Sequence, residues 1–286
     1  TSDELKEAIQ IAAENIRKFH TAQRREVLTI ETMPGVRCWR KSIAIEKVGI
    51  YIPGGSAPLF STVLMLGIPA QLAGCKEVIL CSPPGSDGKI DASILYAAQI
   101  AGISTIFKVG GAQAIGALAY GTESVPAVDK IFGPGNQYVT CAKQLINQQE
   151  TAIDIPAGPS EVMIIADESA EPSFVVADLL SQAEHGADSQ VMLATTSELL
   201  IEKVQHEINR QLAILPRAAI AAQSLTNSMT ILLSNDDELM NFVNEYAPEH
   251  LIINTINCDQ LAERVVNAGS VFLGPYSPEA VGDYAS

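Results

Sequence analysis

The chain has 286 residues, of which 47% are hydrophobic and 18% are charged, and this composition indicates a folded globular protein rather than a disordered one. Its formal net charge of -15 would repel nucleic acid and anionic membrane surfaces, so we expect neither as a partner. The apolar runs are interrupted by Gly, Pro or Lys before they reach the roughly 18 residues that a spanning helix needs. The N-terminus shows no basic start followed by an apolar run, so we expect a cytoplasmic protein.

Cysteine usage agrees with a reducing compartment. The five cysteines are odd in number and show no CxxC or other ligand spacing. They are Cys38, Cys75, Cys81, Cys141 and Cys258. We assign them no catalytic role, because no pattern pairs one of them with a base.

An amphipathic helix is expected to open the chain. Ser2 is a suitable N-cap, and apolar residues from Leu5 to Phe19 recur at helical spacing. The sequence that follows is less regular, and Pro34-Gly35 separates two short strand candidates at residues 27–30 and 42–45.

From Val48 onwards, apolar runs alternate with helical patterns in two series. The first series comprises Val48–Ile52, Val78–Cys81, Thr105–Val109 and Lys130–Phe132. The second comprises Val162–Ala166, Gln190–Ala194, Met229–Leu233, Leu251–Ile253 and Val271–Leu273. These runs lack clean alternation and are separated by helices, so they predict parallel strands that are covered on both faces.

A Pro/Gly cluster at residues 154–160 joins the two series. This organisation predicts an α/β fold of two Rossmann-like, doubly wound lobes with parallel sheets. We expect one lobe to comprise residues 51–158 and the other to comprise residues 1–50 together with 159–286. One large sheet is the alternative, since repeated βα units do not by themselves count domains.

Three strand ends of the first series run into glycine-containing loops, at residues 51–58, 109–113 and 132–136. Loops without side chains let backbone N–H groups approach a pyrophosphate, so these loops favour a dinucleotide site at the carboxyl edge of this lobe. None of them is GxGxxG, and ordinary βα turns are the alternative.

Gln182 and His185 lie three residues apart at the end of a helical pattern. Residues at this spacing share a helix face and can converge on one metal ion. An imidazole is a good zinc ligand and an amide oxygen is a weaker one. Alternatively, His185 and Gly186 only terminate the helix, where an imidazole favours the negative end of the dipole.

Glu249 and His250 precede the apolar run Leu251–Ile253, at the mouth of a buried strand. A carboxylate and an imidazole supply two bases of different pKa, which suits a reaction that removes protons in stages. The alternative is a salt-bridged surface glutamate beside a core histidine. Judged from its position near the last residue alone, Asp283 is expected to be solvated.

Seven motifs together occur in the order and spacing of one enzyme family. They are YIPGG at residues 51–55, GGAQAI at 110–115, FGPGN at 132–136, PAGPSE at 156–161, SQAEHG at 181–186, PEHL at 248–251 and GDYAS at 282–286. In this combination the chain resembles histidinol dehydrogenase over nearly its whole length.

This resemblance implies an NAD- and zinc-dependent enzyme of histidine biosynthesis. The family oxidises L-histidinol through L-histidinal to L-histidine and passes two hydrides in turn to two NAD molecules. The resemblance implies Gln182, His185 and Asp283 as zinc ligands, in a site where the metal holds the imidazole and amino nitrogens of the substrate. The metal there is a template more than an acid.

The resemblance also assigns roles to the remaining motif residues. His250 would take the alcohol proton, and Glu249 would help to activate the water of the second oxidation. Ser160 is implied as a substrate contact, as are His250 and the zinc ligands. The implied NAD contacts are Tyr51, Gln113 and Asn136.

A longer, homodimeric parent protein is implied as well. After the GDYAS motif the family continues with a Gly-rich motif that contains Asn-His, and then with a tail that supplies a fourth zinc ligand across a dimer interface. The family also has further N-terminal residues. Two alternatives remain open: a related zinc-dependent dehydrogenase of another small polar alcohol, and a truncated fragment that is inactive by itself.

Overall fold

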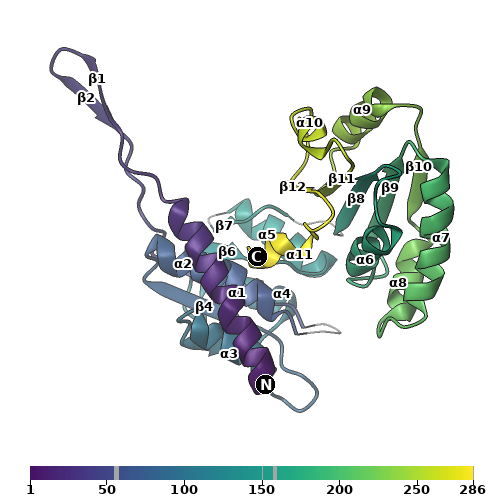
Figure 1. Ribbon diagram of the computed structural model, residues 1–286. Coiled ribbons are helices and arrows are strands. Elements are labelled where there is room, and N and C mark those ends of the chain that lie inside the picture. The colour runs from purple at the N-terminus through teal and green to yellow at the C-terminus, as the bar shows by residue number, and fades with distance from the viewer. Residues whose placement is uncertain (55–57, 150, 157–159, 286) are drawn as a thin grey trace. The chain divides into compact units, whose positions relative to one another are not determined.

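The computed structural model describes residues 1–54, 58–149, 151–156 and 160–285, which separate into two compact units (Figure 1). The first unit holds the described residues up to Pro156 together with 283–285, and the second holds residues 160–282. Residues 55–57 of the first glycine loop, residues 157–159 of the expected connection and Ser286 lie outside the described residues. In the part that is described, no helix combines the length and the apolar character needed to cross a membrane.

The first unit begins with a helix and a hairpin and continues as alternating strands and helices. In chain order its elements are α1 (Asp3–Ala22), β1 (Thr29–Met33), β2 (Val36–Trp39), β3 (Lys47–Tyr51), α2 (Phe60–Ala73), β4 (Glu77–Cys81), α3 (Ala92–Ile100), β5 (Thr105–Phe107), α4 (Gly111–Tyr120), β6 (Lys130–Phe132), α5 (Gln137–Asn147) and β7 (Ala152–Ile153). Strands β3 to β7 form a parallel sheet in the order β5-β4-β3-β6-β7. The strand order reverses between β3 and β6, and such a switch point is where open α/β sheets bind ligands.

Helices cover both faces of this sheet because successive side chains of a strand point to opposite sides. Ile50 and Ile52 pack with α1, α2 and α3 on one face. Tyr51 and Ile131 pack with α4 and α5 on the other. The two cores explain why the strands of this series are apolar without a clean alternation.

Residues 1–50 belong to the first unit in the structure. Helix α1 buries Ile9, Ala13 and Ile16 in the core that α2 and α3 share with the sheet. Strand β3 lies at the centre of the sheet, between β4 and β6. This arrangement differs from the expected division, which grouped residues 1–50 with residues 159–286, because the apolar face of α1 is buried in the first core.

The early strands form an antiparallel hairpin whose turn is Pro34-Gly35, with Gly35 at a φ of 83°. Pairing runs from Met33 and Val36 at the turn to Thr29 and Trp39 at the open end. The prediction of a strand at residues 42–45 is wrong. The tight turn pairs β1 with residues 36–39, so the pairing ends at Trp39 and residues 42–45 have no partner strand in the hairpin.

The second unit repeats the same architecture. Its elements are β8 (Glu161–Ala166), α6 (Pro172–Ala183), β9 (Gln190–Thr195), α7 (Glu198–Leu212), α8 (Ala218–Leu225), β10 (Met229–Leu232), α9 (Asp236–Tyr246), β11 (His250–Asn254), α10 (Cys258–Ala262), β12 (Ser270–Leu273) and the start of α11 (Ala280–Tyr284). The parallel sheet has the order β10-β9-β8-β11-β12, so each unit places its strands in the sequence 3-2-1-4-5. Helices α6, α7 and α8 cover one face, and α9 and α10 cover the other. Both expected Rossmann-like lobes are therefore confirmed.

Candidate active site

In the first unit, the expected cofactor residues lie after three parallel strands, at the carboxyl edge of the sheet. Tyr51 ends β3, Gln113 is in the first turn of α4 after β5, and Asn136 follows β6. Gln113 and Asn136 are exposed, whereas Tyr51 is buried and its hydroxyl accepts a hydrogen bond of 2.9 Å from the N–H of Gly111. Tyr51 therefore ties the start of α4 to the end of β3.

Asn136 caps the helix that follows the third glycine loop. Its Oδ1 accepts hydrogen bonds from the N–H groups of Tyr138 and Val139, at 3.1 and 3.2 Å. This use of the side chain satisfies donors that every helix leaves unpaired in its first turn. The cap fixes Asn136 at the switch point between β3 and β6, where a pyrophosphate would meet a helix N-terminus.

The loop between β6 and Asn136 requires glycine at position 133. Gly133 has a φ of 124°, and a Cβ atom there would lie 2.0 Å from the carbonyl oxygen of Tyr51. Gly110, the N-cap of α4, is also restricted, because its Cβ would lie 2.5 Å from a carbon of Pro83. Both glycines thus lie too close to neighbouring backbone or proline to carry a side chain. Close packing therefore accounts for glycine at these positions even without a ligand.

A buried ion pair holds the Gly133 loop. The ammonium group of Lys143, only 4% exposed, pairs with Asp154 and donates to the carbonyl oxygen of Gly133 at 2.7 Å. The other oxygen of the Asp154 carboxylate accepts the N–H of Gly133, also at 2.7 Å. Both backbone groups of one glycine are thus bound by the two partners of one ion pair. No sequence signal indicated this pair, because Lys143 occupies an ordinary position within a helical pattern.

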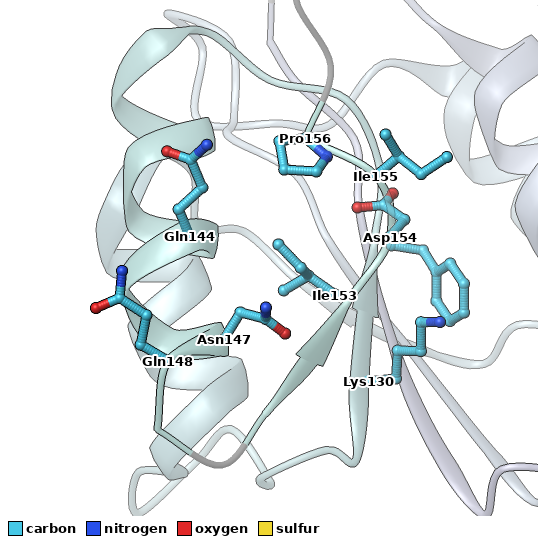
Figure 2. A pocket seen from close by; sticks show the side chains of 9 residues that line it. Lys130, Gln144, Asn147, Gln148, Ile153, Asp154, Ile155 and Pro156 are labelled. Carbon is cyan, nitrogen blue, oxygen red and sulfur yellow. The ribbon is translucent and has the colours of Figure 1, made fainter.

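A groove of about 790 Å³ adjoins the ion pair (Figure 2). Gln144, Asn147 and Gln148 of α5 line one side of it, and the segment from Ile153 to Pro156, which includes Asp154, lines the other. Neither Gln113 nor Asn136 lines this groove. The groove therefore lies beside the glycine loop rather than at the expected cofactor residues.

In the second unit, the expected catalytic residues lie at the amino edge of the sheet. His250 is the first residue of β11, and Glu249 precedes it. Ser160 immediately precedes β8, the strand that pairs with β11. The two units thus have the same strand order but expose their candidate residues at opposite edges of their sheets.

The orientation of His250 is set by a backbone group. Its Nδ1 lies 2.9 Å from the carbonyl oxygen of Glu161, and a carbonyl can only accept, so Nδ1 carries a proton. In the neutral imidazole, Nε2 is then the proton acceptor. Nε2 lies 3.9 Å from a carboxylate oxygen of Glu279, and the His250 side chain is 22% exposed. A half-buried base with a defined tautomer results.

Glu249 is anchored by its backbone and leaves its side chain half exposed. Its N–H donates to the Glu161 carboxylate at 3.1 Å, and its own carboxylate lies 3.9 Å from Nδ1 of His250. Tyr246 donates to the second oxygen of Glu161 at 2.8 Å. Burial and this hydrogen bond to Glu161 raise the pKa of Tyr246 to about 12, so its hydroxyl stays protonated. Glu161 therefore positions both residues of the pair.

The side-chain amide of Gln182 is buried and has no hydrogen-bond partner among the residues that the structure describes. It lies in the last turn of α6, is 1% exposed, and neither its amide nitrogen nor its amide oxygen has a partner within the described residues. Buried amides are almost always bonded, so an unsatisfied one needs an explanation. A metal ion that binds the amide oxygen would satisfy this atom, so Gln182 fits the implied zinc site.

The other implied zinc ligands are less closely associated with Gln182. His185 is exposed and lies beyond the end of α6, whose last residue is Ala183, so it is not in the helical turn that the sequence suggested. Asp283 lies on α11 and groups with the first unit. Among the described residues, no cluster of three or more His, Cys, Asp or Glu side chains is arranged to hold a metal. The structure thus places Gln182 and His185 in one unit but does not assemble a complete metal site.

Two further acidic residues lie near this site. Glu279 approaches His250, and its negative charge acts on Asp178 of α6, one helical turn before Gln182. Burial, and then the charge of Glu279, raise the pKa of the Asp178 carboxyl to about 7. No sequence signal marked either residue, since their proximity arises from the packing of segments about a hundred residues apart.

The fold and these residues define a two-lobed protein of the doubly wound α/β class, with glycine loops at the switch point of one lobe and a carboxylate–imidazole pair in the other. The family model of histidinol dehydrogenase matches residues 1–286. The chain therefore belongs to the histidinol dehydrogenase family.

Individual relatives agree with this assignment. The histidinol dehydrogenase of Bacteroides thetaiotaomicron is 64% identical over 285 residues, which cover 100% of this chain and 67% of that protein. That of Escherichia coli K12 is 56% identical over 287 residues, covering 100% of this chain and 65% of that protein. The crystal structure of histidinol dehydrogenase from Elizabethkingia anophelis matches with a TM-score of 0.97 and 57% identity, over 99% of this chain and 66% of that one. The chain thus spans about two thirds of the length of these relatives.

More distant structures share only the fold. Gamma-glutamyl phosphate reductase from Thermotoga maritima matches with a TM-score of 0.52 at 14% identity, covering 100% of this chain and 86% of that one. An NAD-dependent aldehyde dehydrogenase from Sinorhizobium meliloti matches with a TM-score of 0.57 at 15% identity, covering 91% of this chain and 66% of that one. The two-lobed scaffold therefore extends beyond the family.

Proposed function

We propose that this chain carries the catalytic core of a histidinol dehydrogenase, which oxidises L-histidinol through L-histidinal to L-histidine with NAD. The observation that carries the proposal is the family match over residues 1–286, with relatives at 56% and 64% identity. The geometry at His250 is compatible with it, because a base with a fixed tautomer lies in the same unit as the buried amide of Gln182, which has no partner among the described residues.

In the first oxidation, His250 accepts the hydroxyl proton of the alcohol at Nε2 while a hydride leaves the carbinol carbon. The hydrogen bond from Nδ1 to the Glu161 carbonyl keeps Nε2 available and stabilises the imidazolium that forms. Glu279, 3.9 Å from Nε2, then faces a positive charge. In the second oxidation, Glu249 accepts a proton from the water that hydrates the aldehyde, for which its half-exposed carboxylate is accessible.

Gln182, His185 and Asp283 are the residues that would hold zinc, and Ser160 would contact the substrate. The bound metal would supply a template for the imidazole and amino nitrogens of histidinol. The unsatisfied amide of Gln182 is the observation in this chain that supports such a site.

NAD is proposed to bind at the carboxyl edge of the first unit, where it would accept the hydride. Gln113 and Asn136 expose their side chains there, and Tyr51 fixes the start of α4 through Gly111. The glycine loops and the helix N-terminus after Asn136 provide backbone donors suited to a pyrophosphate.

We further propose that the parent protein is a cytoplasmic homodimer whose partner is a small molecule rather than nucleic acid or a membrane. The net charge of -15 supports the exclusion of polyanions. All five cysteines lie in the described ranges and are free thiols, as in a reducing compartment.

The test is a turnover assay on the complete gene product with added zinc, with NADH formation followed against L-histidinol and a panel of other amino alcohols. Production of NADH from histidinol above all others is expected. Efficient oxidation of another alcohol instead would support the related-dehydrogenase alternative, and no activity with any of them would refute the proposal. The 286-residue chain, assayed in parallel with metal analysis, shows whether this portion is active alone.

A substitution separates the two proposed roles of the second unit. His250→Asn should lower turnover by at least about a hundredfold while leaving zinc content unchanged, because the residue is proposed as a base and not as a metal ligand. Equal loss of metal and turnover would contradict this division.

A further inference from the structure

Tyr246 ends helix α9, close in the chain to the Glu249–His250 pair. The residue after it, Ala247, has a φ of 59°, and its N–H donates to the carbonyl oxygen of Val243 at 2.8 Å. This left-handed cap ends the helix and turns the chain into β11, which begins at His250. An alanine adopts this conformation only where the surrounding structure holds it, so the segment between the phenol and the pair is sharply defined.

The hydroxyl of Tyr246 lies between two acceptors. Oε2 of Glu161 is 2.8 Å away, and Oε1 of Gln190 is 3.0 Å away. The amide nitrogen of Gln190 donates to the carbonyl oxygen of Asn227 at 3.0 Å, which leaves the amide oxygen facing the phenol. A hydroxyl has one proton to donate, and a carboxylate is a stronger acceptor than an amide. The proton of Tyr246 therefore goes to Glu161.

Glu161 and Glu249 each bind the backbone of the other. The N–H of Glu249 donates to Oε1 of Glu161 at 3.1 Å, and the N–H of Glu161 donates to the Glu249 carboxylate at 3.4 Å. The two side chains carry like charges, so their repulsion opposes this arrangement. The donors to Glu161 offset the repulsion: the N–H of Glu249 holds one carboxylate oxygen, and Tyr246 holds the other.

His250 depends on Glu161 in a different way. Its Nδ1 donates to the carbonyl oxygen of Glu161 and not to the carboxylate. The pairing of β8 with β11, in which His250 lies opposite Val162, holds that carbonyl in place. A change in the Glu161 side chain should therefore disturb Glu249 more than His250.

We propose that Tyr246 is a positioning residue whose hydroxyl fixes the Glu161 carboxylate and, through it, the place of Glu249 in the second oxidation. The inference rests on the function proposed above. A purely structural role is the alternative, because the Tyr246 ring packs in the core of its unit, with its centroid 6.0 Å from that of Phe242. Tyr246→Phe separates the two roles, since it keeps the ring and removes only the hydroxyl.

The first test compares the two oxidations in the complete, zinc-loaded parent protein, with L-histidinol and L-histidinal as separate substrates. Tyr246→Phe should lower kcat with L-histidinal by roughly tenfold and with L-histidinol by less than about threefold, with KM and zinc content unchanged. Tyr120→Phe is the matched control, because it removes a hydroxyl that donates to Gln149 in the first unit. It should change neither rate. Equal losses of kcat with both substrates, or an effect on KM alone, would contradict the inference.

A double-mutant cycle tests whether Tyr246 acts through Glu161. Glu161→Met removes both carboxylate oxygens and keeps the carbonyl that binds His250. Adding Tyr246→Phe to this variant should lower kcat with L-histidinal by less than about twofold more, because the hydroxyl then has no carboxylate to hold. A further loss as large as that of Tyr246→Phe alone would show that the hydroxyl acts independently of Glu161.

Amide hydrogen exchange of the 286-residue chain provides a measurement that needs neither zinc nor NAD. In Tyr246→Phe the N–H of Glu249 should exchange at least about fivefold faster, since its acceptor is no longer held. The N–H of Gly269, which donates to the Pro248 carbonyl at 3.0 Å, is the internal reference and should keep its rate. Equal acceleration of both amides would indicate general destabilisation and would overturn the inference.

The outcomes distinguish this inference from the proposed function. An unchanged parent protein that oxidises neither L-histidinol nor L-histidinal would refute both. An active parent protein in which Tyr246→Phe behaves like Tyr120→Phe would overturn the role of Tyr246 and leave the proposed function standing.

Discussion

Lys143 donates from Nζ to the carbonyl oxygen of Gly133 across 2.7 Å, and both residues are buried. Asp154 binds the N–H of the same glycine and the Lys143 ammonium, so three residues form one closed polar unit under the loop. Because the loop lies at the switch point of the first sheet, its rigidity bears directly on the proposed cofactor site.

Replacing Lys143 with Met should weaken NAD binding to the chain by roughly five- to tenfold, because the loop loses its pre-organisation. Isothermal titration calorimetry measures this change without requiring turnover. Lys143→Arg, which keeps the charge, should recover part of the affinity. Lys130→Met, which removes an ammonium that lies 5.0 Å from the centroid of the Phe132 ring, is the control for loss of a positive charge in the same sheet. Equal loss in both variants would contradict a specific role for the ion pair.

Gly133→Ala should destabilise the first unit by about 3 kcal/mol or more, since its Cβ would meet the Tyr51 carbonyl and its φ is unfavourable for other residues. Gly116 lies inside α4, and a Cβ added to it would have no neighbouring atom within 4 Å, so Gly116→Ala should stabilise by about 0.5–1 kcal/mol. Urea unfolding gives both values. A Gly133→Ala variant as stable as the parent chain would mean that the loop can shift.

Gln182→Met should stabilise the metal-free chain by about 1–2 kcal/mol, because an apolar side chain replaces a buried amide that has no partner among the described residues. The same substitution should abolish zinc binding at this site. Gln211→Met is the matched control: it removes bonds from its amide nitrogen to the Ser173 carbonyl and to Glu207, both 2.8 Å, and should destabilise. Thermal unfolding combined with metal analysis distinguishes the variants. Destabilisation by Gln182→Met would show that the amide has a partner after all.

Asp178→Asn should stabilise the chain at pH 8 more than at pH 4. The pKa of Asp178 is raised to about 7 in the folded state, so the folded protein retains a proton that the unfolded chain loses from about pH 4 upwards. The contribution of Asp178 to the free energy of unfolding therefore falls as the pH rises from about 4 to about 7, and it is constant at higher pH.

The gain from Asp178→Asn at pH 8 should be about 1–2 kcal/mol, a value reduced because the carboxyl is partly accessible to solvent. Urea unfolding across this pH range tests it, with Glu168→Gln, an exposed site of the same unit, as the control. A gain that does not depend on pH would exclude an ionisation effect.

Most of the fold could be predicted from the sequence because the central strands are buried on both faces and read as continuous apolar runs. All nine expected strand runs from Val48 onwards appear as strands of the two sheets. β7 was missed, since two residues, Ala152 and Ile153, are too few to form a pattern. Residues 1–50 were grouped with the other lobe because an amphipathic helix such as α1 indicates that one face is buried, but not which core buries it.

The site was predictable only where a residue type itself suggested chemistry. Glu249 and His250 were recognisable as an adjacent acid and base. Gln182 and His185 were recognisable because their three-residue spacing places them on one helix face. Glu161 could not be recognised, because its contacts with Glu249 and His250 join residues 88 and 89 positions apart through the pairing of β8 with β11. The unsatisfied state of Gln182 likewise depends on its surroundings and not on its sequence position.

The use of consecutive strands in each sheet has a consequence for folding during synthesis. All strands of the first sheet precede every strand of the second sheet in the chain, so they are synthesised first. Domains generally fold as units in the order of translation. The elements up to β7 can thus bury their two cores before the segment that carries Glu249 and His250 is synthesised.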